Sequence, residues 1–296
     1  MTLSLSRWLG SKAWLVRSYP QHIPEPEGRR RAFDCTAGAC SIPLHWLARG
    51  HRVVIGDANP RLVGCLRNLQ ERPEAVIGTL AAEASAYTDA KDQREDFYTR
   101  RGHLNRLAPE SLEASALFLF VLRAGFNGQY RESGNGNCSV AWGDPLNAKG
   151  KAYASRGDKP FRKDLVRADE LRAIARLLKR ADIRVGDFEA TSADIRRGEA
   201  LFCDPPYVDR SAFVGYSRAG FNLQDRLRLT AWLRGLDKRG VRWTMTDVAT
   251  PESMAAHGLW NVDILTVRRS VAANGTRESA KELVCRNWKE AKEQAA

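Results

Sequence analysis

The chain has 296 residues, of which 43% are hydrophobic and 28% charged, with a formal net charge of +12 and a pI near 9.7. This length and apolar content favour one large α/β domain with room for a smaller insertion. No apolar stretch approaches membrane-spanning length, and the N-terminus MTLSLSRWLGSKAW lacks the apolar core of a signal peptide, so we expect a cytoplasmic protein without a membrane partner. The basic excess suits a polyanionic partner.

The cysteine pattern argues against a metal site. The six cysteines form no CxxC pair and have no metal-ligand spacing. We therefore expect reduced, mostly buried thiols and no metal.

The first part of the chain predicts a β-turn-α-β unit. Residues 31–35 and 52–57 are short apolar runs typical of strands, and a Gly/Ala/Ser turn and a helix near 44–49 separate them. A second helix is expected over 60–72, starting at a proline. This order predicts parallel neighbouring strands, as in a Rossmann-like sheet.

The middle of the chain, 74–163, loses this alternation. It holds a helical pattern over 110–123 and then a Gly/Asn-rich loop, so we interpret it as an inserted, mainly helical domain between a first part, 1–73, and a second part, 164–296. The segment 149–163 carries six basic residues against one acid. Such a segment either contacts phosphates or is simply solvated surface.

The α/β pattern resumes after the insertion. Helices are expected over 165–180 and 223–239, and strands over 183–187, 200–204, 241–246, 262–267 and 282–288. Asn222 is expected to cap the second of these helices with Asp225 in its first turn, and Gly240 to end it.

The turn FDCTAGACS (33–41) and the end of the second strand indicate a nucleotide-like ligand. Gly38 lets the backbone approach a ligand closely, and Asp57 can accept both hydroxyls of a ribose, or else merely cap the next helix. The chain has no GK[ST] ending and the turn is not GxGxxG, which disfavours ATP and NAD. An adenosine ligand without phosphates fits better, and S-adenosylmethionine is the candidate.

The stretch LFCDPPYVDR (201–210) ends an apolar strand with Asp204, two prolines and Tyr207. The prolines fix φ at both positions, and the first pushes Asp204 toward extended backbone. A rigid loop with a carboxylate, a free carbonyl and an aromatic face can hold a planar group that carries NH2. A proline-stopped strand with a solvated Asp is the alternative.

Six blocks occur in the order of a known family: RWLGSKAWL (7–15), FDCTAGACS (33–41), IGDAN (55–59), LRAGFNGQYR (122–131), CDPPY (203–207) and RRSVAANGTRESAKELV (268–284). Together they resemble the Dam-like (D12 class, alpha group) DNA adenine-N6 methyltransferases and span nearly the whole chain. The resemblance implies a Rossmann-like, S-adenosylmethionine-dependent methyltransferase sheet with an inserted DNA-recognition domain.

The resemblance also implies the cofactor contacts. Trp8 and Lys12 match the family's cofactor-contacting Trp and Lys, Gly38 would pass under the methionine end and Asp57 would hold the ribose. Arg7 lies at a position that can reach DNA. An aromatic plug and an exposed lysine remain the structural alternatives for the Trp and the Lys.

The chemistry explains the types of residue in the proposed catalytic loop. The lone pair of the adenine amine is delocalised into the ring, so the nitrogen is a poor nucleophile. If Asp204, which also borders the cofactor, accepts one N–H and the Pro205 carbonyl the other, the lone pair can turn toward the methyl group. Pro206 stiffens the loop, Tyr207 would stack on a base flipped out of the duplex, and Phe221 would close that base pocket.

The block after residue 122 matches the family's DNA-recognition hairpin. Arg131 takes the place of the arginine that reads a guanine, a contact that suits a bidentate guanidinium. Asn127 and Gly128 are also a strong hairpin signal by themselves. Arg123 either contacts phosphate or pairs with an acid, and Tyr130 belongs to the same DNA-facing set.

Several positions depart from the family pattern. CSVA (138–141) replaces the usual Phe-Asn-Val-Pro after GNGN, so a GATC site is not assured. Cys40 stands where a glycine is usual, Cys35 replaces a proline and Ser11 replaces a glycine. The expectation is a monomeric, bacterial or phage-encoded enzyme that methylates adenine N6 in duplex DNA. The alternatives are a catalytically weakened DNA-binding descendant, adenine methylation in RNA and, with a small share, cytosine N4 methylation.

Overall fold

The computed structural model describes residues 5, 10–126, 130–143, 165–206, 221–268 and 279–289. Five expected site residues lie outside the described residues, as does the basic segment 149–163: Arg7, Trp8, Asn127, Gly128 and Tyr207.

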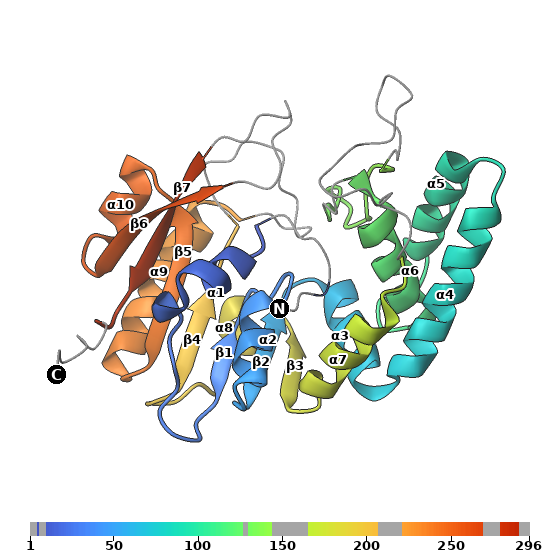
Figure 1. Ribbon diagram of the computed structural model, residues 1–296. Coiled ribbons are helices and arrows are strands. Elements are labelled where there is room, and N and C mark those ends of the chain that lie inside the picture. The colour runs from blue at the N-terminus through green and yellow to red at the C-terminus, as the bar shows by residue number, and fades with distance from the viewer. Residues whose placement is uncertain are drawn as a thin grey trace.

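The described part of the chain forms a seven-stranded sheet with the order β3-β2-β1-β4-β5-β7-β6 (Figure 1). Neighbouring strands from β3 to β5 are parallel, whereas β7 is antiparallel to both β5 and β6. This arrangement confirms the expected Rossmann-like fold class. The strands are β1 (Ala32–Asp34), β2 (Val53–Asp57), β3 (Ala181–Val185), β4 (Ala200–Cys203), β5 (Arg242–Val248), β6 (Asn261–Arg268) and β7 (Ser279–Arg286).

The helices confirm some expectations and add elements that the sequence did not indicate. Asn222 caps α9 in a capping box with Asp225, and Gly240 follows the helix with a φ of +70°, both as predicted. The helices are α1 (Ala13–Ser18), η1 (Pro20–His22), α2 (Ser41–Ala48), α3 (Pro60–Glu71), α4 (Pro73–Asp89), α5 (Gln93–Leu104), α6 (Leu112–Ala124), α7 (Ala168–Leu178), α8 (Phe188–Thr191), α9 (Leu223–Lys238) and α10 (Pro251–His257). Among them, no helix is both long and apolar enough to cross a bilayer.

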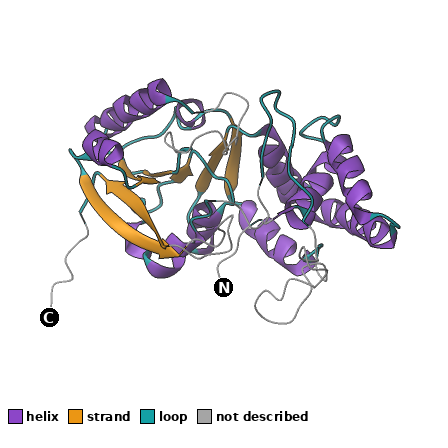
Figure 2. Ribbon diagram, turned by 90° about the horizontal axis from the view of Figure 1, so that it is seen from above, coloured by secondary structure: helices purple, strands orange, loops and turns teal. Residues whose placement is uncertain are grey.

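Side-chain alternation along the strands builds a core on each face of the sheet, and Figure 2 shows the helices on both sides. Ala32, Ile55 and Phe202 pack with helices α2, α3 and α7 on one face. Phe33 and Leu201, one position away in their strands, pack with α8 and α9 on the other. Because both faces are buried, the parallel strands are continuous apolar runs, which is why they could be predicted.

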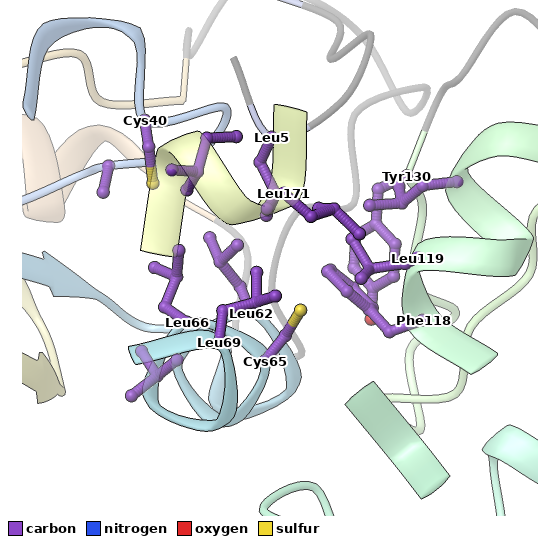
Figure 3. Close-up of a cluster of buried hydrophobic side chains, with 14 of the residues drawn as sticks. Leu5, Cys40, Leu62, Cys65, Leu66, Leu69, Phe118, Leu119, Tyr130 and Leu171 are labelled. Carbon is purple, nitrogen blue, oxygen red and sulfur yellow. The ribbon is translucent and has the colours of Figure 1, made fainter. Parts of the chain in front are cut away.

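Helices α4, α5 and α6 form a helical layer beside the sheet (Figure 1). Helix α4 packs on α3 and α7, α6 packs on α3, and α5 packs on α4 and α6. All five helices share one hydrophobic core, and Figure 3 shows Leu66 of α3, Phe118 of α6 and Leu171 of α7 around it. The middle of the chain is therefore mainly helical over 73–124, whereas 130–143 consists of turns and isolated β-bridges. The division into domains at 73 and 163 stays a prediction.

The strand order reverses direction between β1 and β4. The chain runs outward from β1 through β2 to β3, and then returns to the other side of β1 to form β4 and β5. Open α/β sheets bind ligands at the carboxyl ends of the strands at such a switch point. Asp34, which ends β1, and Asp204, which follows β4, flank it.

Candidate active site

The carboxylate of Asp204 is held by a different donor at each oxygen. The Lys12 ammonium lies 2.6 Å from Oδ2, and the Thr246 hydroxyl donates to Oδ1 at 2.7 Å. The backbone N–H of Asp204 donates to Oγ1 of Thr36 at 2.6 Å. Pro205, which follows, is buried. The predicted catalytic loop therefore begins at a residue whose carboxylate is held at both oxygens and whose backbone N–H is anchored.

Lys12 comes from the segment that leads into α1, 192 positions before its partner in sequence. Its ammonium also donates to the carbonyl of Gly10 at 3.0 Å, and the residue is only 5% exposed. The alternative of an exposed lysine is therefore wrong. Whether this side chain also contacts a cofactor stays a prediction.

A hydrogen-bonded chain leads from the loop back to β1. The backbone N–H of Thr36 donates to Oδ1 of Asp34 at 3.0 Å, and the hydroxyl of Thr36 accepts the N–H of Asp204. Asp34 is 3% exposed. These contacts tie the turn after β1 to the loop after β4 across the switch point.

Three carboxyl groups gather at the strand ends. Burial raises the pKa of Asp34 well above its usual range, and the nearby charges of Asp204 and Asp57 raise it further. Burial also raises the pKa of Asp57, and that of Asp204, where the Lys12 charge acts in the opposite direction. A ligand that carries positive charge would favour the ionised forms of these carboxyl groups and would be stabilised by them.

The predicted cofactor turn is organised around Asp57. Its Oδ2 accepts the backbone N–H of Gly38 at 3.0 Å, and its Oδ1 accepts the N–H of Asn59 at 2.8 Å. Asn59 is the residue that caps α3, through bonds to the N–H groups of Arg61 and Leu62. The alternative that Asp57 only caps this helix is therefore wrong.

The turn also explains why glycine is usual at position 40. Gly38 has a φ of +45° and Cys40 a φ of +59°, both in the left-handed region that favours glycine. The thiol of Cys40 is fully buried and donates to the carbonyl of Gly38 at 3.6 Å. A side chain is accommodated here, at a backbone cost of about 1–2 kcal/mol.

The segment 130–143 begins with a side chain that points into the core. Tyr130 is 1% exposed and packs edge-on against Phe118 with ring centroids 5.2 Å apart. Figure 3 shows these two side chains next to each other in the core. Its hydroxyl donates to Glu132 at 2.7 Å. The expectation that Tyr130 contacts DNA is therefore wrong for this structure, because its polar atom faces inward. Arg131, between two inward-facing residues, is half-buried.

The same segment is fastened to the helices beneath it. Arg61 of α3 donates to the carbonyl of Gly136 at 3.1 Å and lies 4.0 Å from Glu132. Asn105, after α5, exchanges two hydrogen bonds with the backbone of Cys138. The contacts to Gly136 and Glu132 therefore come from Arg61, which lies two residues after Asn59, the residue that caps α3.

Two other predicted residues lie away from the loop. Arg123 is 7% exposed, and its guanidinium donates to the carbonyls of Leu165 at 2.8 Å and Val166 at 2.5 Å. A buried guanidinium that donates to backbone carbonyls does not fit a phosphate contact, so the DNA-binding prediction for Arg123 is wrong for this structure. Phe221 is half-buried and packs against the core under α9, and its role in a base pocket stays a prediction.

Four residues at the site were missed from sequence: Asp34, Thr36, Arg61 and Thr246. Asp34 had a usable signal, because it ends the first strand as Asp57 ends the second. Thr246 had none, since a threonine in a buried strand is usually only a β-branched packing residue. In the described residues, no group of three or more His, Cys, Asp or Glu side chains could hold a metal.

Comparisons with known proteins agree with this geometry. A Type II methyltransferase of Lactococcus lactis subsp. cremoris is 24% identical over 295 residues, covering 96% of this chain and 94% of the relative. The DNA adenine methylase of Escherichia coli is 24% identical and covers 94% and 92% of the two chains. A solved precorrin 8W decarboxylase from Methanobacterium thermoautotrophicum, with a TM-score of 0.35 and 12% identity, covers 93% and 89%, a likeness too low to bear on the fold.

The family model called D12 class N6 adenine-specific DNA methyltransferase matches residues 8–256. The match includes the turn after β1, the acid that ends β2 and the loop after β4, which the sheet brings to one edge. The chain therefore belongs to the D12 class of N6 adenine-specific DNA methyltransferases.

Proposed function

We propose that the protein transfers a methyl group from S-adenosylmethionine to N6 of an adenine flipped out of duplex DNA. The observation that carries this proposal is the placement of Asp204. Its carboxylate lies at the switch point of the sheet, is oriented by Lys12 and Thr246, and is followed by two prolines. This is the acceptor that an exocyclic amine needs.

The charges at the strand ends support the choice of cofactor. S-adenosylmethionine would supply an electrophilic methyl group on a sulfonium, and it also carries an ammonium. A cation bound beside the buried carboxyl groups of Asp34 and Asp57 would favour their ionised forms, and Gly38 provides a close backbone approach. The residues present therefore fit a cationic adenosine ligand. Trp8, outside the described residues, is the remaining candidate contact.

The loop would act on the amine by orientation. Asp204 would accept one N–H of the amine and the carbonyl of Pro205 the other, so that the nitrogen can rehybridise and its lone pair is no longer delocalised into the ring. The new N–C bond would form as the S–C bond of the sulfonium breaks, which leaves a neutral thioether, and the extra amine proton would leave after the transfer. Tyr207 provides the stacking face and Phe221 closes the pocket. Burial raises the pKa of Asp204, but the Lys12 ammonium opposes this and favours the ionised form, in which Asp204 would act as a hydrogen-bond acceptor.

Arg131 is the proposed reader of the target sequence. It stands between Tyr130 and Glu132, which bond to each other on the inner side of the segment. A guanidinium presented on such a fixed backbone suits the two major-groove acceptors of guanine. Asn127 and Gly128 would form the neighbouring turn. Mapping the methylated sites would identify the recognition sequence. The same map would bear on whether the protein serves restriction, self-protection or regulation.

The direct test uses purified protein, labelled S-adenosylmethionine, and duplex DNA and RNA of equal sequence. We expect the label in N6-methyldeoxyadenosine from the duplex. Label mainly in RNA would instead indicate RNA methylation. Label in N4-methylcytosine would show that the target base is cytosine. Isothermal titration identifies the remaining rival: DNA affinity without any heat of cofactor binding would indicate a silent DNA-binding descendant.

Two finer expectations accompany the function. We propose that the protein acts as a monomer and works in the bacterial cytoplasm, where DNA and cofactor are both present. Light scattering of the purified protein at micromolar concentration tests the first. A mass of twice the 33.1 kDa chain would contradict it.

A further inference from the structure

Thr246 lies next to the proposed catalytic loop without belonging to it. It is a residue of β5, which pairs in parallel with β4 in a register that sets Cys203 against Met245. Asp204 and Thr246 are the next residues along the two paired strands, so they lie side by side. Thr246 is fully buried, and its hydroxyl donates to Oδ1 of Asp204 at 2.7 Å.

We propose that Thr246 is a positioning residue for methyl transfer, whose hydroxyl fixes the plane of the Asp204 carboxylate. This inference rests on the proposed function of Asp204 and adds a residue that acts through it. Three observations carry it: the separate donors at the two oxygens, the rigidity of a β-branched side chain in a strand, and the anchored backbone of Asp204.

Lys12 and Thr246 constrain the Asp204 carboxylate in different ways. Rotation of a carboxylate about its last bond is broad and roughly two-fold, so one contact leaves the plane free to turn. Lys12 supplies a compact charge on a long, flexible chain to Oδ2. Thr246 supplies a hydroxyl on a stiff χ1 to Oδ1. Only the pair of donors, one at each oxygen, fixes the direction of the lone pairs that remain for an incoming amine.

The backbone contact completes the arrangement. The N–H of Asp204 is bonded to Thr36, so the carboxylate cannot shift as a unit when its side-chain donor is lost. Removing the Thr246 hydroxyl should therefore change the orientation of the carboxylate rather than its position. Errors in orientation weaken the reacting geometry more than they weaken binding.

The hydrogen bond from Thr246 also affects the pKa of Asp204. Burial raises the pKa of Asp204, whereas Lys12 and the Thr246 hydroxyl lower it and Glu282 of β7 raises it. Among the described residues, Asp34 of β1 is a further carboxyl group near it. Without the Thr246 donor, the pKa of Asp204 rises further, and the ionised acceptor is present only at higher pH.

Strand β5 offers a matched control. Thr244 lies two positions earlier on the same face, is equally buried, and donates to the carbonyl of His22 at 2.8 Å. Thr244→Val and Thr246→Val remove the same group from the same environment. Only the second removes a donor from Asp204.

The test is the single-turnover rate of methyl transfer with saturating S-adenosylmethionine and DNA. Thr246→Val should lower this rate by about 10- to 100-fold, which is the effect of one hydrogen bond to a charged group, and should leave KM values within a few-fold. Its pH–rate profile should shift its acidic limb to higher pH. Thr246→Ser should restore rate and profile, and Thr244→Val should change neither.

Two outcomes would overturn the inference: a normal rate and acidic limb in Thr246→Val, or equal losses in Thr244→Val. Should Thr246→Val not fold, Thr246→Ala and Thr246→Ser differ by a single hydroxyl and give the same comparison. Asp204→Ala separates this inference from the function. An active Asp204→Ala refutes the function itself, whereas an inactive Asp204→Ala beside a normal Thr246→Val refutes only the role of Thr246.

Discussion

The carboxylate of Asp57 accepts the backbone N–H of Gly38 at 3.0 Å, which joins the end of β2 to the turn after β1. The bond holds the turn in a left-handed conformation, with φ at +45° for Gly38, beside the acid that would hold the ribose. The two elements that the sequence assigns to the cofactor therefore form one unit. Distorting the turn should disturb cofactor binding directly.

Gly38→Ala should weaken binding of S-adenosylmethionine at least about tenfold and destabilise the fold by about 1–2 kcal/mol, the cost of a side chain in left-handed backbone. Gly28→Ala is the control, because Gly28 has a similar φ of +56° and nothing lies within 4 Å of its added Cβ. It should lose similar stability and keep its affinity in isothermal titration. Equal affinity in both variants would argue against the turn as a cofactor contact.

Arg61→Met should relax the choice of methylated sequence, because Arg61 fastens the segment that carries Arg131 through Gly136 and Glu132. In an expressing host, Arg61→Met should methylate additional sites, and these should overlap with the additional sites that Arg131→Ala methylates. The control is Arg67→Met on the same helix, since Arg67 bonds to the carbonyl of Ile183 in β3 instead. An Arg61→Met methylome identical to the wild type would contradict the anchoring role.

Arg123→Met should lower the free energy of unfolding by about 1–3 kcal/mol, because the buried carbonyl of Leu165 and the partly buried carbonyl of Val166 lose their donor. The measurement is urea unfolding. The slope of log DNA affinity against log salt should stay unchanged, since a buried guanidinium neutralises no phosphate. A slope reduced by about 0.9 would instead restore the phosphate contact.

Asp34→Asn should gain stability over the wild type as pH rises from about 4 to 7. Because the pKa of Asp34 is raised in the folded state, the native protein binds more protons than the unfolded chain in this window, and wild-type stability falls as pH rises. Urea unfolding at pH 5 and pH 7 measures the difference. Exposed Asp89→Asn is the control, and an equal pH trend in both variants would contradict the effect of burial.

The sequence predicts the sheet well and its edges less well. The apolar runs of β1, β2 and β4 are continuous because both faces of these strands are buried. Strand β3 is at an edge, where only Ile183 is buried, and it spans 181–185 instead of the expected 183–187. Pairing with β2, which sets Val185 against Asp57, decides its bounds.

Helix starts were missed where no capping signal exists. Helix α2 begins after Cys40 and α7 after Arg167, both with left-handed backbone and no side-chain cap. The expected helices over 44–49 and 165–180 therefore have different bounds, 41–48 and 168–178. A positive φ at a residue other than glycine follows from tertiary contacts, which a local pattern does not contain.

The site residues also divide into those that have a local sequence signal and those that have none. Asp57 and Asp204 could be predicted because strand ends and proline pairs are local signals. The contacts of Lys12 and Thr246 with Asp204 span 192 and 42 positions, and no periodicity encodes them. Tyr130 was misplaced because an aromatic residue beside the predicted recognition arginine has the same sequence signal whether it faces DNA or the core.

The most direct measurement of the central claim is the N6-methyladenine content of DNA from a host that lacks adenine methylation of its own. The host expresses either the wild-type protein or Asp204→Asn, with folding verified by circular dichroism. We expect sequence-specific N6-methyladenine with the wild type and at least about a hundredfold less with Asp204→Asn, because the amide loses the ionised acceptor. Unmethylated DNA with the wild type, or equal methylation with both proteins, would contradict the account.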